Sequence, residues 1–157
     1  MNKTPTNELL QTFAPMWVWK EVIKQAQRSP QKRHKTGAVI FNKPRNPNLL
    51  SVGTAHPHNG GHKVASIHAE ADAISRVHKN APVYDAVCVV VTLTRDGHFA
   101  MSSRPCEGCA AQLKAKGLWR VVWCEKANDG SWAVNSESPE QLLEGTLIKT
   151  KYTEEMT

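Results

Sequence analysis

One run of residues, AVCVVVTLT (86–94), restricts the fold of this 157-residue chain more than any other feature. It is almost wholly apolar and rich in β-branched side chains, which predicts a strand buried on both faces. Shorter runs of the same character at 36–41, 49–55 and 120–124 predict three more strands. Because helical patterns separate several of these strands, some neighbours must be parallel, since only a crossover connection joins parallel strands. The chain is therefore predicted to be α/β, with a mixed sheet covered by helices.

Three stretches between or before these strands have the features of helices. Residues 13–27 place apolar side chains at helical spacing on one face. Residues 66–79 follow Ser66, a favourable N-cap. Residues 105–116 begin with a proline and are followed by a glycine, which is the usual asymmetry of helix ends. We expect a helix over each stretch.

The C-terminal part predicts a further helix and strand. Ser138-Pro139-Glu140-Gln141 has the spacing of a capping box, so a short helix is expected before Gly145. TLIKTKY (146–152) is then predicted to be the fifth strand, parallel to the fourth at 120–124 because a helix would connect them. The prediction is a three-layer α-β-α domain over residues 1–157, with a five-stranded mixed sheet and a loose N-terminus over 1–12.

Composition and charge limit the class of protein and its partners. The hydrophobic fraction is 40%, and no apolar run approaches the ~20 residues of a membrane helix, so we expect no membrane partner. The N-terminus lacks the apolar core of a signal peptide, which favours a cytoplasmic location. Residues 1–45 hold nine Lys or Arg but only two Asp or Glu. This surplus predicts a phosphate-bearing partner, a nucleotide or a nucleic acid, although a solvated surface explains it equally well.

The residues that carry chemistry are His68 and Glu70 at the start of one predicted helix, and Cys106 and Cys109 at the start of another. Zinc prefers imidazole and thiolate ligands, and a catalytic site supplies three of them plus water. Glu70 is two residues from His68, where it is expected to carry protons beside the open coordination position rather than bind the metal. Taken separately, each motif is weak evidence for a catalytic zinc site, because Cys-x-x-Cys also forms redox pairs and structural zinc sites. Together they predict a catalytic Zn²⁺ site, the signature of zinc nucleobase deaminases.

The segments TGAVIF, IHAEADAI, SRPCEGC and RVVWC resemble the cytidine deaminase-like superfamily over roughly residues 36–125. The resemblance implies a five-stranded mixed sheet, with His68, Cys106 and Cys109 as zinc ligands and Glu70 as the catalytic acid and base. It implies a hydrolase acting on the C–N bonds of cyclic amidines. It also implies subunits that complete one another's pockets, so we expect a homo-oligomer.

The substrate is less narrowly defined. Parallel fourth and fifth strands would resemble the branches that act on deoxycytidylate, tRNA adenosine or polynucleotides. A deoxycytidylate-like cytosine nucleotide ranks first, and a base in single-stranded nucleic acid (cytosine in DNA or RNA, or adenosine in tRNA) ranks second. A catalytically silent zinc module that binds nucleic acid is the remaining alternative. The sequence departs from the family in a stretch inserted at 94–104 and in lacking the usual sugar-contacting Asn after the second strand. The residues predicted to contact substrate are Ala69, His56, Asn59, Ser103 and Arg104.

Overall fold

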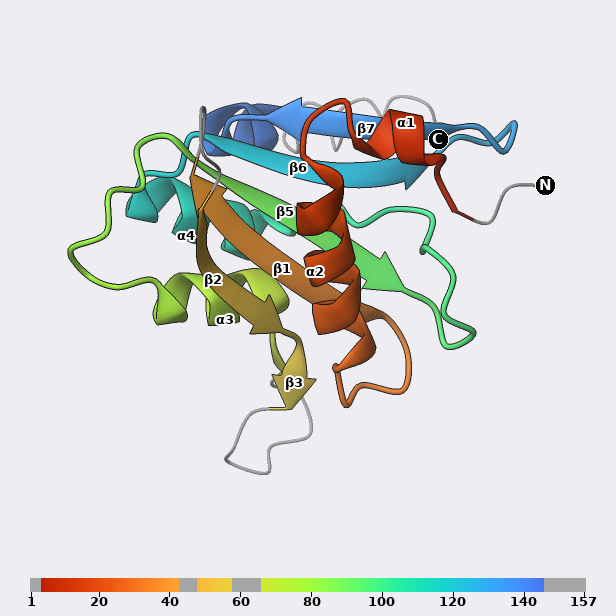
Figure 1. The fold of residues 1–157 in the computed structure, drawn as a ribbon, viewed down its shortest axis with the longest axis horizontal. Coiled ribbons are helices and arrows are strands. Elements are labelled where there is room, and N and C mark those ends of the chain that lie inside the picture. The colour runs from red at the N-terminus through yellow and green to blue at the C-terminus, as the bar shows by residue number, and fades with distance from the viewer. Residues whose placement is uncertain (1–3, 43–47, 58–65, 146–157) are drawn as a thin grey trace.

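A five-stranded mixed sheet lies between two layers of helices in the computed structural model, which describes residues 4–42, 48–57 and 66–145 (Figure 1). The sheet order is β2-β1-β5-β6-β7. Its strands are β2 (Leu49–Thr54), β1 (Lys35–Asn42), β5 (Ala86–Leu93), β6 (Arg120–Lys126) and β7 (Trp132–Glu137). The helices are α1 (Asn7–Leu10), α2 (Met16–Gln27), α3 (Ala69–Arg76) and α4 (Glu107–Lys116), and residues 139–145 are also helical. A separate small pair joins β3 (His56–Pro57) to β4 (Ser66–Ile67).

The central strand β5 is buried on both faces, as its apolar run predicts. Val87, Val89 and Val91 pack against α2 on one face, whereas Cys88 and Val90 join the cluster on the other. This alternation follows from the two-residue period of a strand. Helices α3 and α4 and residues 139–145 supply the second cluster, so the three-layer α-β-α architecture is confirmed.

The fifth strand differs from the prediction. It is β7, which returns directly from β6 as an antiparallel hairpin and precedes the helix at 139–145. Gly130, at φ 88°, lies in the turn between the two strands, where Ala127 and Ser131 are joined by a backbone hydrogen bond. Because a left-handed glycine permits such a tight return, no crossover is needed. The parallel pair in the sheet is β5 with β6, while the run at 146–152 lies outside the described residues.

The predicted capping box at the last helix is confirmed. The Ser138 hydroxyl accepts from the Gln141 amide at 3.1 Å, and the Gln141 side chain accepts from the Ser138 amide at 2.9 Å. The N-terminal stretch expected to be loose contains the short helix α1, whose Leu10 joins the core. No helix among the described residues is long and apolar enough to cross a membrane.

The stretch inserted at 94–104 forms a small hairpin at the end of β5. The Thr94 amide donates to the His98 carbonyl at 2.7 Å, and Leu93 and Phe99 form a β-bridge. Phe99 packs edge-on against Trp132, with the ring centroids 6.0 Å apart. The insertion is therefore anchored to the core and holds its exposed turn in a defined place beside β1.

Candidate metal centre

Two helices on the same face of the sheet begin at residues predicted to bind metal. His68 is the N-cap of α3 and Cys106 is the N-cap of α4, each with extended backbone angles. The predicted helices at 66–79 and 105–116 thus begin later, because Ser66 and Ile67 form β4 and Pro105 precedes the cap. Since a helix N-terminus presents unpaired N–H groups and a positive dipole end, both helix starts favour negative charge at the same point.

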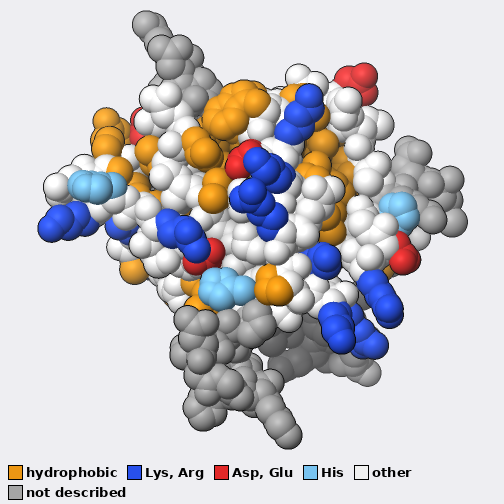
Figure 2. All heavy atoms as spheres, turned by 60° about the horizontal axis from the view of Figure 1, so that its bottom comes forward, with side chains coloured by type: hydrophobic (Ala, Val, Ile, Leu, Met, Phe, Trp, Pro, Cys, Tyr) orange, Lys and Arg blue, Asp and Glu red, His pale blue; other side chains and the backbone are white. Residues whose placement is uncertain are grey.

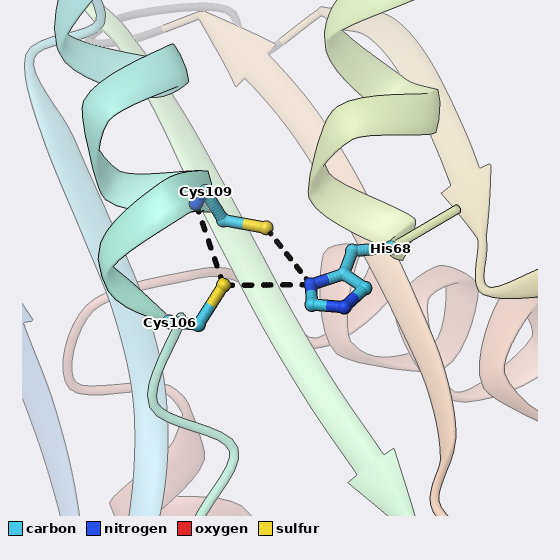
Figure 3. A group of neighbouring side chains, drawn as sticks. All are labelled: His68, Cys106 and Cys109. Carbon is cyan, nitrogen blue, oxygen red and sulfur yellow. Dashed lines mark hydrogen bonds between the residues drawn. The ribbon is translucent and has the colours of Figure 1, made fainter. Parts of the chain in front are cut away.

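The three predicted ligands lie together (Figure 3). The Nδ1 atom of His68 faces both sulfurs, 3.2 Å from Cys109 Sγ and 3.5 Å from Cys106 Sγ. The Cys106 sulfur also accepts the Cys109 amide at 3.4 Å, which is the capping contact of α4. Three potential ligand atoms from two helices therefore point at one spot.

The spacing of these atoms fits Zn²⁺. Tetrahedral bonds of about 2.0–2.1 Å to nitrogen and 2.3 Å to sulfur put the two ligand atoms about 3.6 Å apart. The observed nitrogen–sulfur separations of 3.2 and 3.5 Å are close to this value. Within the part of the chain that the structure describes, the group has three members, all with ligand atoms within 4.8 Å of one another. A site with three protein ligands leaves one tetrahedral position open, as in catalytic rather than structural zinc centres.

Close packing between β2 and α3 fixes the position of His68. A Cβ atom at Gly53 would collide with backbone atoms of Ala69 and Ala73, so only glycine allows α3 to lie this near β2. The Ser51 hydroxyl donates to the Ala73 carbonyl at 2.8 Å. Because His68 directly precedes α3, these contacts place its imidazole relative to the sulfurs of α4.

Glu70 is in the first turn of α3 and is 4% exposed. Burial raises the pKa of its carboxyl above the usual value, while hydrogen bonding and the neighbouring His68 and Cys109 oppose the rise. A buried carboxyl whose pKa is raised above its usual value is suited to take up and release a proton. Its environment is thus that of a proton carrier.

The two cysteines differ in their surroundings. Cys106 is exposed, whereas Cys109 is buried. Burial raises the pKa of the Cys109 thiol well above its usual range, and the Glu70 carboxylate and Cys106 raise it further. These effects outweigh the lower thiol pKa that a position at a helix N-terminus would by itself predict. A coordinated cation reverses the preference of Cys109 for its protonated form, because a thiol that binds metal is deprotonated.

A pocket of about 320 Å³ opens beside the ligand group. His68, Glu70 and Cys106 are among its lining residues. The other lining residues are Gln31, Arg33, His34, Thr36, Ala55, Ala69, Val90, Thr92, Ser103 and Arg104. Its volume is at the lower end of the range for small-molecule sites. Glu70 and two of the three metal ligands therefore line one space of a size suited to a small molecule.

The residues predicted to contact substrate are only partly brought to this pocket. Ala69, Ser103 and Arg104 line it. The Ser103 hydroxyl is already engaged, since it donates to the Val90 carbonyl at 3.1 Å and accepts from the Cys124 amide at 3.2 Å. His56 is absent from the lining, and its Nδ1 lies 2.8 Å from the Thr54 carbonyl oxygen. Asn59 lies outside the described residues.

Arg104 has one unused polar atom near the pocket. A terminal nitrogen donates to the Leu142 carbonyl at 2.8 Å, and the guanidinium carbon lies 6.0 Å from the centre of the Trp123 ring. Its buried Nε has no hydrogen-bond partner among the described residues. The Arg104 side chain is thus fixed through its terminal nitrogen, while its Nε donor has no partner among the described residues.

Sequence reasoning missed several pocket residues in the connection between α2 and β1. Gln31 and His34 were not singled out, and Arg33 entered only as part of a basic stretch. His34 has φ 53°, a left-handed conformation that is uncommon for a residue other than glycine. No pattern in the sequence marks these residues, because the folding of β1 beside β5 brings them to the pocket.

Comparison with known families agrees with this geometry. Among curated proteins, no significant match to the chain is found. The family model described as the cytidine and deoxycytidylate deaminase zinc-binding region matches residues 15–125, which include α2, the strands from β1 to β5, all but the last residue of β6 and all three metal ligands. With an imidazole and two sulfurs at zinc spacing on the starts of two helices, the chain belongs to the cytidine and deoxycytidylate deaminase zinc-binding family.

Proposed function

We propose that the protein removes the exocyclic amine of a cytosine nucleotide by zinc-dependent hydrolysis, with a deoxycytidylate-like nucleotide as its substrate. The observation that carries the proposal is that Glu70 and the ligands His68 and Cys106 line one pocket. A purely structural zinc site has no need of a buried carboxylate, which costs folding free energy when charged. This disfavours the alternative of a catalytically silent zinc module.

The ligands His68, Cys106 and Cys109 would hold the ion. Zinc bound in this way supplies acidity to water at its open position. Glu70 would take up a proton from a water molecule whose oxygen adds to C4 of the cytosine ring, and would return that proton to the ring nitrogen N3. It would then carry the second proton of the water to the amine, so that the C4–N bond breaks and the products are a uracil ring and ammonia. The burial that raises the pKa of Glu70 supports the proposal, because a carboxyl with a raised pKa holds a proton more readily than an exposed one.

The walls of the pocket support a flat, partly polar ligand. Val90 and Ala69 offer apolar surface, and the hydroxyls of Thr36 and Thr92 lie 2.9 Å from each other. In the proposed complex the base lies between the apolar side chains with its amine toward Glu70.

A phosphate on the substrate is supported by charge alone. Arg33 and Arg104 both line the pocket. The argument from a parallel fifth strand no longer applies, because β7 is antiparallel to β6. The second candidate, a base in single-stranded nucleic acid, is favoured by the exposure of Arg33 and His34 at the pocket, which leaves room for a longer strand to enter.

The test is a panel of cytosine and adenine nucleosides, nucleotides and short oligonucleotides, assayed for ammonia with the zinc-loaded protein. We expect release from a cytosine nucleotide, a loss of at least about 10²-fold in kcat for Glu70→Gln, and an unchanged zinc content. Glu140→Gln removes an exposed carboxylate on another helix and is the matched control. Full activity of the Glu70 variant would refute the mechanism, and absence of ammonia from every substrate would refute the function.

A further inference from the structure

A second pocket, of about 590 Å³, adjoins the one at the metal centre. It shares Gln31 and Arg33 with that pocket. Its remaining lining residues are Ser29, Pro30, Lys32, Lys35 and Arg95. Gln31 and Arg33 therefore form a wall common to the two spaces, which places the second pocket directly beside the first.

The cations of this second pocket come from two parts of the chain. Lys32, Arg33 and Lys35 lie in and just after the connection between α2 and β1, and Arg95 lies in the turn that follows β5. The β1–β5 register pairs Lys35 with Leu93, which brings that turn beside the connection. The space-filling view brings this side of the molecule forward, and Lys and Arg side chains gather at its lower right (Figure 2).

The connection that carries these cations is held in place. The buried Ser29 hydroxyl donates to the Ala55 carbonyl at 2.6 Å and accepts from the Gln31 amide at 3.3 Å. Ala55 itself lines the pocket at the metal centre. The basic side chains are therefore presented from a backbone fixed to that pocket's wall.

The four cations have no anionic partner in the described part of the chain. The ion pair found there joins Arg76 to Asp72, on α3. No side-chain hydrogen bond or ion pair involves Lys32, Arg33, Lys35 or Arg95 among the described residues. Like charges held together repel one another, and a bound anion removes that cost. Phosphate oxygens suit such a group, because lysine and arginine recognise them with charge-assisted hydrogen bonds.

We propose that this pocket is a phosphate site, in which Lys32, Lys35 and Arg95 bind a phosphate of the substrate whose base is in the metal-centre pocket. Arg33, at the boundary, contacts the sugar–phosphate link between them. The inference rests on the proposed function for the identity of the base, but the binding of phosphate is measurable without turnover. The phosphate belongs either to the target nucleotide or to a neighbouring nucleotide of a single strand.

The test uses a triple variant, Lys32→Gln with Lys35→Gln and Arg95→Gln, which leaves Arg33 in place. Its control removes the same charge from exposed sites elsewhere, Lys20→Gln, Lys24→Gln and Lys114→Gln. Each is assayed with deoxycytidine, with deoxycytidine 5′-monophosphate, and with a short single-stranded oligodeoxynucleotide containing one cytosine. Thermal melting shows whether each variant is folded, and Arg95→Gln alone replaces the triple variant if that fails to fold.

The triple variant is expected to raise KM at least about tenfold for a phosphorylated substrate, with kcat and the deoxycytidine KM nearly unchanged. The dependence of log KM on log salt should also become shallower, by about one unit for each cation that no longer binds phosphate. An effect confined to the monophosphate places the phosphate on the target nucleotide, and an effect confined to the oligonucleotide places it on a neighbour. An equal rise in KM for deoxycytidine, or an equal rise in the control variant, would overturn the proposal.

Binding separates this inference from the proposed function. Fluorescence anisotropy with the labelled oligonucleotide, and competition by deoxycytidine 5′-monophosphate, are measured on the Glu70→Gln protein loaded with zinc. If no substrate yields ammonia but the triple variant still weakens binding about tenfold, the phosphate site stands and the catalytic proposal falls. If ammonia is released and the triple variant binds both probes as tightly as its parent, the phosphate site is refuted alone.

Discussion

Gly53 is the residue whose substitution tests most directly how the fold positions the metal ligands. In Gly53→Ala the new Cβ would lie 2.9 Å from the Cβ of Ala73, and nearer still to the Ala69 carbonyl oxygen and the Ala73 amide nitrogen. Ordinary contacts of this kind begin at 3.4 Å. Helix α3 must therefore move away from β2 by roughly 1 Å, and overpacking of this kind costs about 1–3 kcal/mol in unfolding free energy.

The displacement matters for zinc because His68 directly precedes α3. Metal–ligand distances tolerate deviations of about 0.2 Å, which is less than the expected movement. We therefore expect zinc affinity to fall about 10–100-fold, the range seen when residues that orient a ligand are changed. Competition with a chromophoric chelator measures the affinity, and thermal melting of the zinc-free protein measures the cost to the fold.

Gly108→Ala is the matched control, because Gly108 lies in α4 between the two cysteine ligands. A Cβ atom there meets nothing nearer than the Cys106 sulfur at 3.9 Å. Replacing an unstrained helical glycine should stabilise the protein by about 0.5–1 kcal/mol and leave zinc affinity unchanged. Unchanged melting and zinc affinity for Gly53→Ala, or equal decreases in both variants, would refute the idea that close packing of α3 on β2 sets the site.

Two further predictions concern the thiols and a buried hydroxyl. In the zinc-free protein at about pH 8, iodoacetamide should modify the exposed Cys106 and spare Cys124, because burial raises the pKa of the Cys124 thiol to about 12 and little thiolate exists below that value. Mass spectrometry should show zinc protecting Cys106, and rapid modification of native Cys124 would contradict the expectation. Ser103→Ala should lower the unfolding free energy by about 1–3 kcal/mol, since it leaves the Val90 carbonyl and Cys124 amide without their hydroxyl partner. Urea denaturation measures this, and a decrease below about 0.3 kcal/mol would argue against a role for that hydroxyl.

The metal cluster was predictable because its ligand residues occur in short, local sequence motifs. His68, Cys106 and Cys109 are types that bind zinc, and each stands beside a predicted helix start that follows a strand or loop. The strands at 36–41 and 86–94 were predictable for a similar reason, since a strand buried on both faces needs a continuous apolar run. The Zn²⁺ cofactor and the layer architecture followed from these features.

The fifth strand was not predictable by the same reasoning. Residues 132–137 read WAVNSE, a mixture of polar and apolar side chains, and they are half-buried or exposed at the sheet edge. An edge strand needs only one apolar face. The apolar pattern of residues 132–137 is therefore weaker than that of TLIKTKY (146–152), which was predicted to be the strand. The feature that favours a hairpin here is the Asp129-Gly130 turn between the two strands.

Substrate contacts depend on parts of the chain that meet only in the folded protein. The nearness of Arg95 to Lys35 results from the β1–β5 register, which no local pattern reveals. The predicted contacts of Ala69, Ser103 and Arg104, the homo-oligomer and the cytoplasmic location stay predictions.

The ligands of the metal centre come from separate strand–helix units, with His68 and Cys106 38 positions apart and the whole of β5 between them. A chain in which β5 has not yet joined β1 and β6 offers the ion two sulfurs on one nascent helix and an imidazole elsewhere. Tight uptake of zinc must therefore follow docking of the two units, and the ion then acts as a removable cross-link between them. The order in which refolding chains acquire zinc and bury β5 would reveal this dependence directly.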